Sequence, residues 1–476
     1  MTGVQTCALP IWVFLQASPD DVYYFDLKKL RDFDSSPTKT DWISKRKRAA
    51  KLPNRYLRSD ASIDRERCQV LVEEYFETND EDLKGDRPKQ RSASAKVNSV
   101  FETIRNYQIP IVVIDRSESL ESICRIFETI NSTGTRLTTF DLAVARFYPD
   151  PDLQSLWAES RRDHPILNQY KVDGERVLQV IALLVAAEQN TVIEATRTVL
   201  LNLKKPLVSD HWKAAVSHLV NAYQWAESRG VAPGIFPNEA LMVPLAVFFS
   251  QTDDKWRRKQ AGYQSMLDKW YFASCLQQGA RQASNYRVAE ATGELLRWKT
   301  DGSLPGAPKV LLTTDQIVRL RSTDSRYRAI MAFLRFQMQV DLWTDVPLIP
   351  TNVEDHHIFP AALAKRHGID RVILDSVSNR LLVSTDTNRS LGDRLPQDYL
   401  VKLIDESNTA GVKSRRRELL QLACIPPLPD SREDILSALD VSKAVTFIKD
   451  RAELIYSSLK RVLEDALIPS DTEEDD

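Results

Sequence analysis

The fold of the C-terminal part is decided by Asp355-His356-His357-Ile358-Phe359-Pro360, which is followed by two further segments. Asp375-Ser376-Val377-Ser378-Asn379 leads into the short apolar run Arg380-Leu381-Leu382-Val383-Ser384, which is typical of a strand. Thr385-Asp386-Thr387-Asn388-Arg389-Ser390-Leu391 then begins like a helix, with polar N-terminal residues. A ββα unit is therefore predicted, with strands in the regions Val353–Ile358 and Arg380–Ser384 and a helix that begins at Thr385.

The two adjacent histidines of this unit point to hydrolytic chemistry. Neighbouring side chains on a strand face opposite sides, so one histidine can bind a metal while the other faces a substrate. A neutral histidine near pH 7 can accept a proton from water, and one divalent cation can stabilise the pentacovalent phosphate and the leaving oxygen. One His and one Asn oxygen leave positions open for water and phosphate, which suits Mg²⁺ or Mn²⁺.

This ordered set of residues resembles the His-Asn-His (HNH) nuclease motif, in which a metal lies between a β-hairpin and a helix. The resemblance extends to Asn388-Arg389 and to the following Leu395-Pro396. It implies that His357 is the general base and that Asn379 braces the hairpin and orients His357. It also implies that His356 is the first metal ligand and Asn388 the second.

A second distinctive stretch, Phe127–Leu142, is predicted to be a helix, a turn and a new helix. Thr138 and Asp141 form a capping-box-like pair at the start of that new helix, and Gly134 supplies a positive φ in the turn. The Asn131–Arg136 turn could touch a nucleotide or DNA, although a purely structural turn is the favoured interpretation.

Together with the preceding strand-like run Ile109–Asp115, this stretch resembles the N-terminal domain of GmrSD-type restriction endonucleases. Those proteins couple a nucleotide-hydrolysing, ParB-like domain to a C-terminal HNH-like domain. The nucleotide site of the family lies in an Asp-Gly-Gln-Gln-Arg motif, and this chain contains neither that motif nor a Walker GxxxxGK[ST] sequence. An NTP is therefore implied by the family alone.

The domain organisation follows from these resemblances and from the helical periodicity of the remaining sequence. Met1–Ile11 resembles the in-frame translation of a sequencing adapter, and we expect the native N-terminus to be missing. The fold class is mostly α (α+β overall). The predicted parts are an artefact at 1–11, a truncated ParB-like N-terminal remnant at 12–150, a helical domain at 151–345, an HNH-like ββα-metal nuclease module at 346–425, C-terminal helices at 426–470 and an acidic tail at 471–476.

Helices and linkers within these parts are predicted from periodicity and composition. Linkers are expected at Asn79–Ser94, which is charged and low in apolar residues, and at Asp301–Lys309, which is rich in Gly and Pro. The expected helices are Ile63–Thr78, Glu118–Ile130, Glu175–Glu188, Asp210–Ser228, Asn238–Phe249, Asp254–Ser274, Ala280–Arg297 and Ser325–Val340.

Bulk composition narrows the function classes. The formal net charge is −2, so contact with nucleic acid must come from local basic patches. Candidates for such contact are Arg389, Arg394, Lys45, Arg46, Lys47 and Arg48. No apolar run reaches the length of a membrane span, and the five cysteines match no zinc or disulfide framework, which favours reduced thiols in a cytoplasmic protein.

The sequence thus predicts a metal-dependent endonuclease that hydrolyses DNA phosphodiester bonds. The family resemblance implies restriction of foreign, base-modified DNA with the help of a nucleotide. Two alternatives stay open. One is a catalytically degenerate protein of the same fold that binds DNA or a protein partner, and the other is an HNH nuclease that cleaves RNA. Oligomeric state and the recognised DNA sequence are not specified by these patterns.

Overall fold

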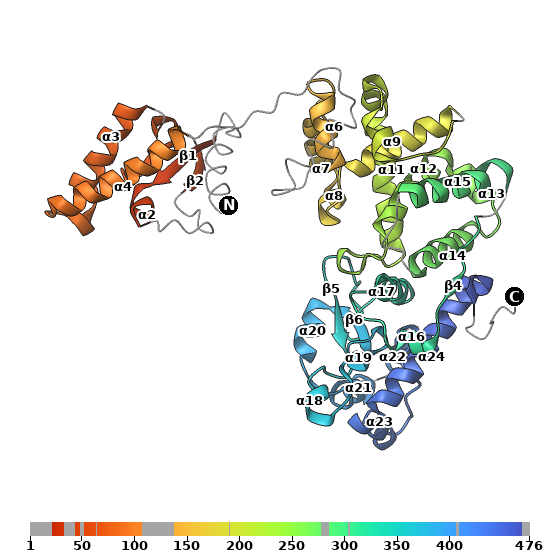
Figure 1. The fold of residues 1–476 in the computed structure, drawn as a ribbon. Helices are drawn as coiled ribbons and strands as arrows, with labels where there is room; N and C mark the ends of the chain where they lie inside the picture. The colour runs from red at the N-terminus through yellow and green to blue at the C-terminus, as the bar shows by residue number, and fades with distance from the viewer. Residues whose placement is uncertain are drawn as a thin grey trace, which may run out of the picture. The chain divides into compact units, whose positions relative to one another are not determined.

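The computed structural model describes residues 21–32, 43–47, 52–62, 64–106, 138–189, 191–277, 285–302, 305–405 and 409–468. The chain divides into two compact units, Met1–Glu118 and Ser119–Asp476 (Figure 1). Several predictions fall outside the described residues: the adapter-like Met1–Ile11, the strand at 109–114, the helix at 118–130, the turn at 131–136 and the acidic tail. The predicted domain limits stay predictions.

The first unit is a small antiparallel sheet with helices. Strand β1 (Asp21–Asp26) lies between β2 (Ile43–Lys47) and β3 (Tyr56–Arg58) and is antiparallel to both. The helical elements are α2 (Leu27–Arg31), η1 (Ser59–Ser62), α3 (Arg65–Glu74), η2 (Tyr75–Asn79), η3 (Glu81–Leu83) and α4 (Arg87–Arg105). The core of this unit is formed by fully buried side chains from the sheet, α3, η2 and α4, among them Phe25, Cys68, Val72, Phe76, Val97 and Phe101.

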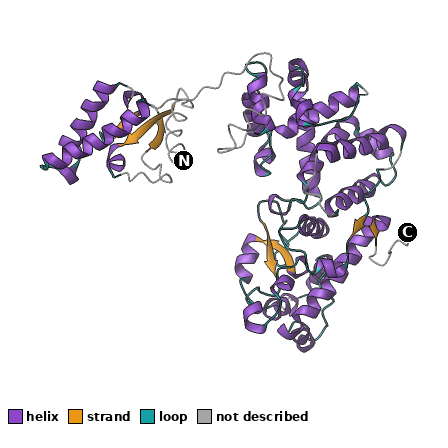
Figure 2. Cartoon of the chain, in the orientation of Figure 1, coloured by secondary structure: helices purple, strands orange, loops and turns teal. Residues whose placement is uncertain are grey.

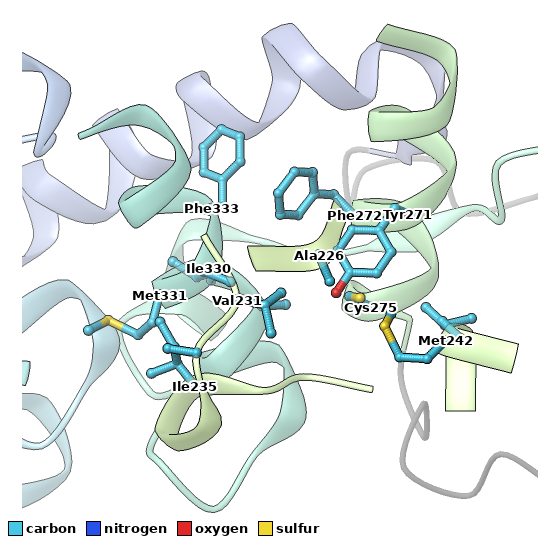
Figure 3. Close-up of a cluster of buried hydrophobic side chains, with 14 of the residues drawn as sticks. Ala226, Val231, Ile235, Met242, Tyr271, Phe272, Cys275, Ile330, Met331 and Phe333 are labelled. Carbon is cyan, nitrogen blue, oxygen red and sulfur yellow. The ribbon is translucent and has the colours of Figure 1, made fainter. Parts of the chain in front are cut away.

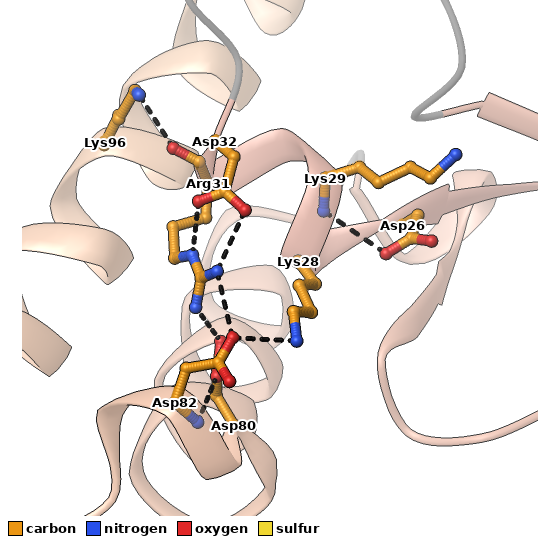
Figure 4. Close-up of polar contacts among 8 residues, drawn as sticks. All are labelled: Asp26, Lys28, Lys29, Arg31, Asp32, Asp80, Asp82 and Lys96. Carbon is orange, nitrogen blue, oxygen red and sulfur yellow. Dashed lines mark hydrogen bonds and ion pairs between the residues drawn. The ribbon is translucent and has the colours of Figure 1, made fainter.

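The predicted linker at Asn79–Ser94 is wrong, because its charges belong to an ordered network. The Asp80 carboxylate is fully buried and accepts a hydrogen bond of 2.7 Å from the Arg31 guanidinium, which also contacts Asp82 (Figure 4). The Lys96 ammonium donates to the Arg31 carbonyl at 2.7 Å, which joins α4 to the end of α2. The low apolar content therefore marks an ion-pair network around the buried Asp80 and the start of α4 rather than a linker.

The second unit is mostly helical, as predicted (Figure 2). Its first half contains α6 (Thr139–Phe147), α7 (Leu153–Asp163), α8 (Pro165–Gln169), α9 (Glu175–Glu188), α10 (Arg197–Leu201), α11 (Lys205–Ser228), η5 (Pro233–Ile235), η6 (Glu239–Leu241), α12 (Met242–Gln251), α13 (Asp254–Lys259), α14 (Tyr263–Leu276), α15 (Asn285–Asp301), α16 (Thr314–Ile317) and α17 (Ser325–Gln337). The helix at 175–188 and the capping box of Thr138 and Asp141 are confirmed. The single helix predicted at 254–274 is wrong, because Gly262 with φ +69° separates α13 from α14.

Helices α11, α14 and α17 share a dense apolar cluster (Figure 3). The rings of Phe272 on α14 and Phe333 on α17 meet edge to face with centroids 5.4 Å apart. Gly230, just after α11, has φ +82° and lies so close to α17 that a Cβ there would be 1.9 Å from the Ala332 carbonyl oxygen. Only glycine allows this approach. It brings the chain that follows α11 against α17.

The second half of this unit contains the predicted hairpin. Strand β5 (Val353–His357) pairs antiparallel with β6 (Arg380–Ser384), with Val353 opposite Ser384 and His357 opposite Arg380. Between the strands lie α18 (Leu363–His367), α19 (Arg371–Leu374) and η8 (Val377–Asn379), and α20 (Thr385–Leu391) follows β6 directly. The predicted order of strand, strand and helix is confirmed.

The remaining elements follow this hairpin in the sequence. They are α21 (Pro396–Asp405), α22 (Ala410–Leu422), α23 (Arg432–Ala438), η9 (Val441–Lys443), α24 (Ala444–Leu463) and η10 (Glu464–Ala466). Strand β4 (Val310–Leu311) pairs in parallel with β7 (Leu467–Ile468). Among the described residues, no helix is long and apolar enough to cross a membrane, and Cys68, Cys275 and Cys424 are buried free thiols.

Candidate functional site

Strand β5 presents acidic and histidine side chains to both of its faces. Glu354 and His356 contact Asn388 on α20, whereas Asp355 and His357 contact residues on the other face. This alternation is the expected geometry of a strand, since successive side chains point to opposite sides. The hairpin therefore carries two distinct polar clusters.

The cluster that faces α20 joins three side chains with metal-binding donor atoms. The His356 Nδ1 lies 2.8 Å from the Asn388 Oδ1, and the Asn388 Nδ2 donates to the Glu354 Oε2 at 2.5 Å. His356 is only 4% exposed, and its Nε2 has no hydrogen-bond partner among the residues that the structure describes. Burial lowers the pKa of His356, so the neutral ring, which is the form that binds metals, is favoured.

The cluster on the opposite face surrounds His357. Its Nε2 lies 3.2 Å from the Asp375 Oδ1, and the Arg371 guanidinium donates to the other oxygen of Asp375 at 2.7 Å. Arg380 lies between the two carboxylates of this face, 3.8 Å from Asp375 and 3.7 Å from Asp355. Burial, together with the positive charge of Arg380, lowers the pKa of His357, so its ring is neutral near pH 7.

Tyr327 extends this cluster to helix α17. Its hydroxyl donates to the Asp355 Oδ2, which leaves Oδ1 directed toward Arg380. Tyr327 is almost fully buried, so Asp355 is fixed from the protein interior. In Asp375, burial would raise the pKa of the carboxyl, but the hydrogen bonds from Arg371 and His357 outweigh it and lower the pKa.

Asn379 connects the hairpin to the turn that precedes β6. Its side chain is fully buried, accepts from the Phe359 backbone N–H at 2.9 Å, and donates to the carbonyls of Phe359 and Leu374 at 2.9 and 2.8 Å. The side-chain amide thus uses both of its N–H donors and one of the two acceptor positions of its oxygen. These contacts are of the bracing kind that the HNH resemblance implies, while an orienting effect of Asn379 on His357 stays a prediction.

Arg451 on α24 holds the same turn from behind. Its buried guanidinium donates to the carbonyls of Val377, Ser378 and Ala423 at distances of 2.9 to 3.3 Å. Burial lowers the pKa of Arg451 to about 10, and the three carbonyls satisfy its donors. The role of Arg451 could not be predicted from the sequence, because one arginine in an amphipathic helix has no distinguishing pattern.

Two further residues of the site, Glu354 and Asp375, have no role in the sequence-based prediction. Glu354 and Asp375 each contact one of the predicted site residues, Asn388 and His357 respectively. Period-two alternation along Val353–His357 could have placed Glu354 on the face of His356. Asp375 could not have been placed, since its position depends on the path of the chain between the strands.

The predicted nucleic-acid contacts have different environments. Arg389 is exposed and 3.5 Å from the equally exposed Asp386, so it is available to a ligand. Arg394 instead donates to the carbonyls of Ser390 and Leu391 and caps the end of α20. Lys45, Arg46 and Lys47 belong to β2, but their side chains, and Arg48 altogether, lie outside the described residues.

The predicted metal ligands and the predicted base are thus brought onto one hairpin, but on opposite faces. In the described part of the chain, no three His, Cys, Asp or Glu side chains form a metal-binding group of their own. The α20 face combines two such residues with the amide oxygen of Asn388. Any metal there must therefore be held by a mixed set of nitrogen and oxygen donors.

Two comparisons with known proteins bear on this chain. Residues 10–148 match the GmrSD restriction endonuclease N-terminal domain. This match agrees with the GmrSD-type resemblance read from Phe127–Leu142. The chain is also 22% identical over 333 residues to the uncharacterized protein MJ0686 of Methanocaldococcus jannaschii, an alignment that covers 67% of this chain and 56% of that relative.

Proposed function

We propose that this protein is a metal-dependent endonuclease that hydrolyses DNA at the hairpin formed by β5 and β6. The observation that carries the proposal is the hydrogen bond of 2.8 Å between His356 Nδ1 and Asn388 Oδ1. It brings together two side chains of metal-binding type, one from strand β5 and one from α20, the helix that follows the hairpin. The match of residues 10–148 to a restriction endonuclease domain supports DNA as the substrate.

The donor atoms of the α20 face fit a divalent cation. The hydrogen bond between His356 and Asn388 brings an imidazole ring and an amide oxygen together, and both groups are of a kind that binds divalent cations. The buried Nε2 of His356, unpartnered within the described structure, leaves this ring available for another interaction. His356 and Asn388 would hold Mg²⁺ or Mn²⁺, which would stabilise charge on the scissile phosphate and on the leaving oxygen.

The other face of β5 supplies a proton acceptor. His357 is neutral near pH 7 and can take the proton of the attacking water, which is the role of a general base. Asn379 keeps the loop after β5 and the turn before β6 in one arrangement, because its amide bonds to both. The opposite orientation of the two histidine rings separates the ligand role of His356 from the base role of His357.

The biological role that we propose is restriction of foreign, base-modified DNA in the cytoplasm. It rests on the restriction endonuclease family of the N-terminal match. Participation of an NTP belongs to the same proposal, with no residue of this chain assigned to it.

A plasmid-nicking assay with purified protein in Mg²⁺, Mn²⁺ or EDTA tests the activity. His357→Ala should lower the cleavage rate about 10²–10⁴-fold and retain Mn²⁺ binding in calorimetry, because only a base is lost. His356→Ala should lose both, because a ligand is lost. His367→Ala, which changes an exposed histidine on α18, is the matched control and should behave as the parent.

The same assay separates the alternatives. Paired DNA and RNA substrates of one sequence would show whether RNA is preferred. DNA binding without cleavage in any divalent cation would favour a degenerate nuclease fold that only binds. Cleavage by His357→Ala at the parental rate would remove His357 from the mechanism.

A further inference from the structure

Asp375 is the residue of the His357 cluster whose placement has the clearest chemical consequence. Its Oδ1 lies 3.2 Å from the His357 Nε2, and its Oδ2 accepts from the Arg371 guanidinium at 2.7 Å. An ionised carboxylate can only accept hydrogen bonds. A neutral His357 must therefore carry its proton on Nε2 to satisfy this contact, which leaves the lone pair on Nδ1.

Two hydrogen bonds fix the backbone on which Asp375 lies. The Asp375 N–H donates to the Arg371 carbonyl at 2.9 Å, so the residue closes the short helix α19. The preceding carbonyl, that of Leu374, accepts from the buried Asn379 amide at 2.8 Å. The carboxylate is thus one residue from a buried clamp, and its position does not depend on a free loop.

We propose that Asp375 is a positioning residue of the nuclease site, which fixes the ring orientation and the tautomer of His357 so that Nδ1 is the atom that accepts the proton of water. This inference rests on the proposed function and adds a residue to it. A carboxylate that hydrogen-bonds to the distal nitrogen of a catalytic or metal-bound histidine is a recurrent means of selecting one tautomer.

A purely structural role for Asp375 is the competing explanation. Arg371 is 60% exposed, so its ion pair with Asp375 contributes little to stability. Arg380 is nearer the interior but lies 3.8 Å away and also faces Asp355. If these pairs were the purpose of Asp375, its replacement would alter stability and leave the tautomer of His357 and the turnover rate unchanged.

The first measurement needs no variant. Nitrogen-15 NMR of the histidine rings in the full chain, with the His357 signals assigned by their loss in His357→Ala, reports which ring nitrogen carries the proton. We expect protonated Nε2 in the wild-type protein without metal and in Mg²⁺. A neutral His357 protonated on Nδ1 would overturn the proposal even if the protein cleaves DNA.

The second measurement compares Asp375→Asn with Asp370→Asn. Both changes remove one negative charge, but Asp370 is exposed and caps α19, a role that Asn fulfils equally well. Asp375→Asn should lower kcat about 10–100-fold, with the KM for DNA and the Mn²⁺ affinity changed less than about twofold. Asp370→Asn should leave all three unchanged.

The outcomes distinguish this inference from the proposed function. A wild-type protein that cleaves no nucleic acid refutes the proposed function, and with it the positioning role of Asp375 in that function. A cleaving wild-type protein whose Asp375→Asn variant retains the parental kcat refutes the role of Asp375 alone. Loss of Mn²⁺ affinity in Asp375→Asn would also refute it, because the contact would then serve the metal site.

Discussion

Replacement of Asn379 by alanine should open the hairpin that carries both candidate clusters. The side chain is fully buried and makes three hydrogen bonds to backbone groups of Phe359 and Leu374, which are themselves buried. Asn379→Ala leaves one N–H and two C=O groups without these partners. A buried polar group that loses its partner costs about 1–3 kcal/mol, so the loss for three such groups should be roughly 3–9 kcal/mol.

The measurement has to be local, because a chain of two compact units does not unfold in one two-state step. Native-state hydrogen exchange followed by mass spectrometry on peptides that cover Val353–Ser384 gives the free energy of opening of the hairpin. Ser378→Ala is the control, since Ser378 is also fully buried but makes one side-chain hydrogen bond, of 2.9 Å to Ser376. That variant should lose about 1 kcal/mol. An Asn379→Ala protein that loses no more than the Ser378→Ala control would refute the bracing argument.

Four further predictions concern the candidate metal ligands, the packing and the dependence on pH. Asn388→Ala should weaken Mn²⁺ binding in calorimetry without lowering the melting temperature by more than a few degrees, and unchanged affinity would exclude Asn388 as a ligand. Gly230→Ala should lower the free energy of unfolding by at least about 2 kcal/mol, because its Cβ would be 1.9 Å from the Ala332 carbonyl oxygen at a φ of +82°. A melting temperature equal to that of the parent would contradict this prediction. Arg451→Met should destabilise the second unit by about 3 kcal/mol in thermal unfolding, because three buried carbonyls lose their donor. Without metal, the hairpin should lose hydrogen-exchange protection as the pH falls from about 6.5. Burial lowers the folded-state pKa of both His356 and His357, so the unfolded chain binds more protons than the folded chain in this range. If His356→Ala leaves the pH dependence equally steep, His356 is not a source of it.

The hairpin could be predicted because its information is local. A short apolar run bounded by polar residues and a polar helix start indicate strand, strand and helix within a short segment. The contact of His356 with Asn388 follows from that order, since α20 starts directly after β6. The long helix α9 was equally predictable, because its apolar residues extend over its whole length.

The contacts that complete the site could not be predicted, because they join segments far apart in the sequence. Tyr327 reaches Asp355 from α17, and Arg451 reaches the turn before β6 from α24. Neither residue belongs to a motif, and each becomes meaningful only when the helices are packed. The error at Asn79–Ser94 has the same origin, since Asp80 is buried by Arg31, a residue 49 positions earlier.

The contacts of α24 determine which piece of this chain could be studied by itself. A fragment that stops after α22 would keep every candidate ligand and base but would lack Arg451, so the carbonyls of Val377 and Ser378 would have no donor from that helix. Pairing of β7 with β4 likewise links residues near 310 to residues near 467. An excised segment that contains the hairpin therefore has to begin before β4 and continue through β7. A shorter fragment without activity would be evidence about its own folding rather than about the chemistry of the hairpin.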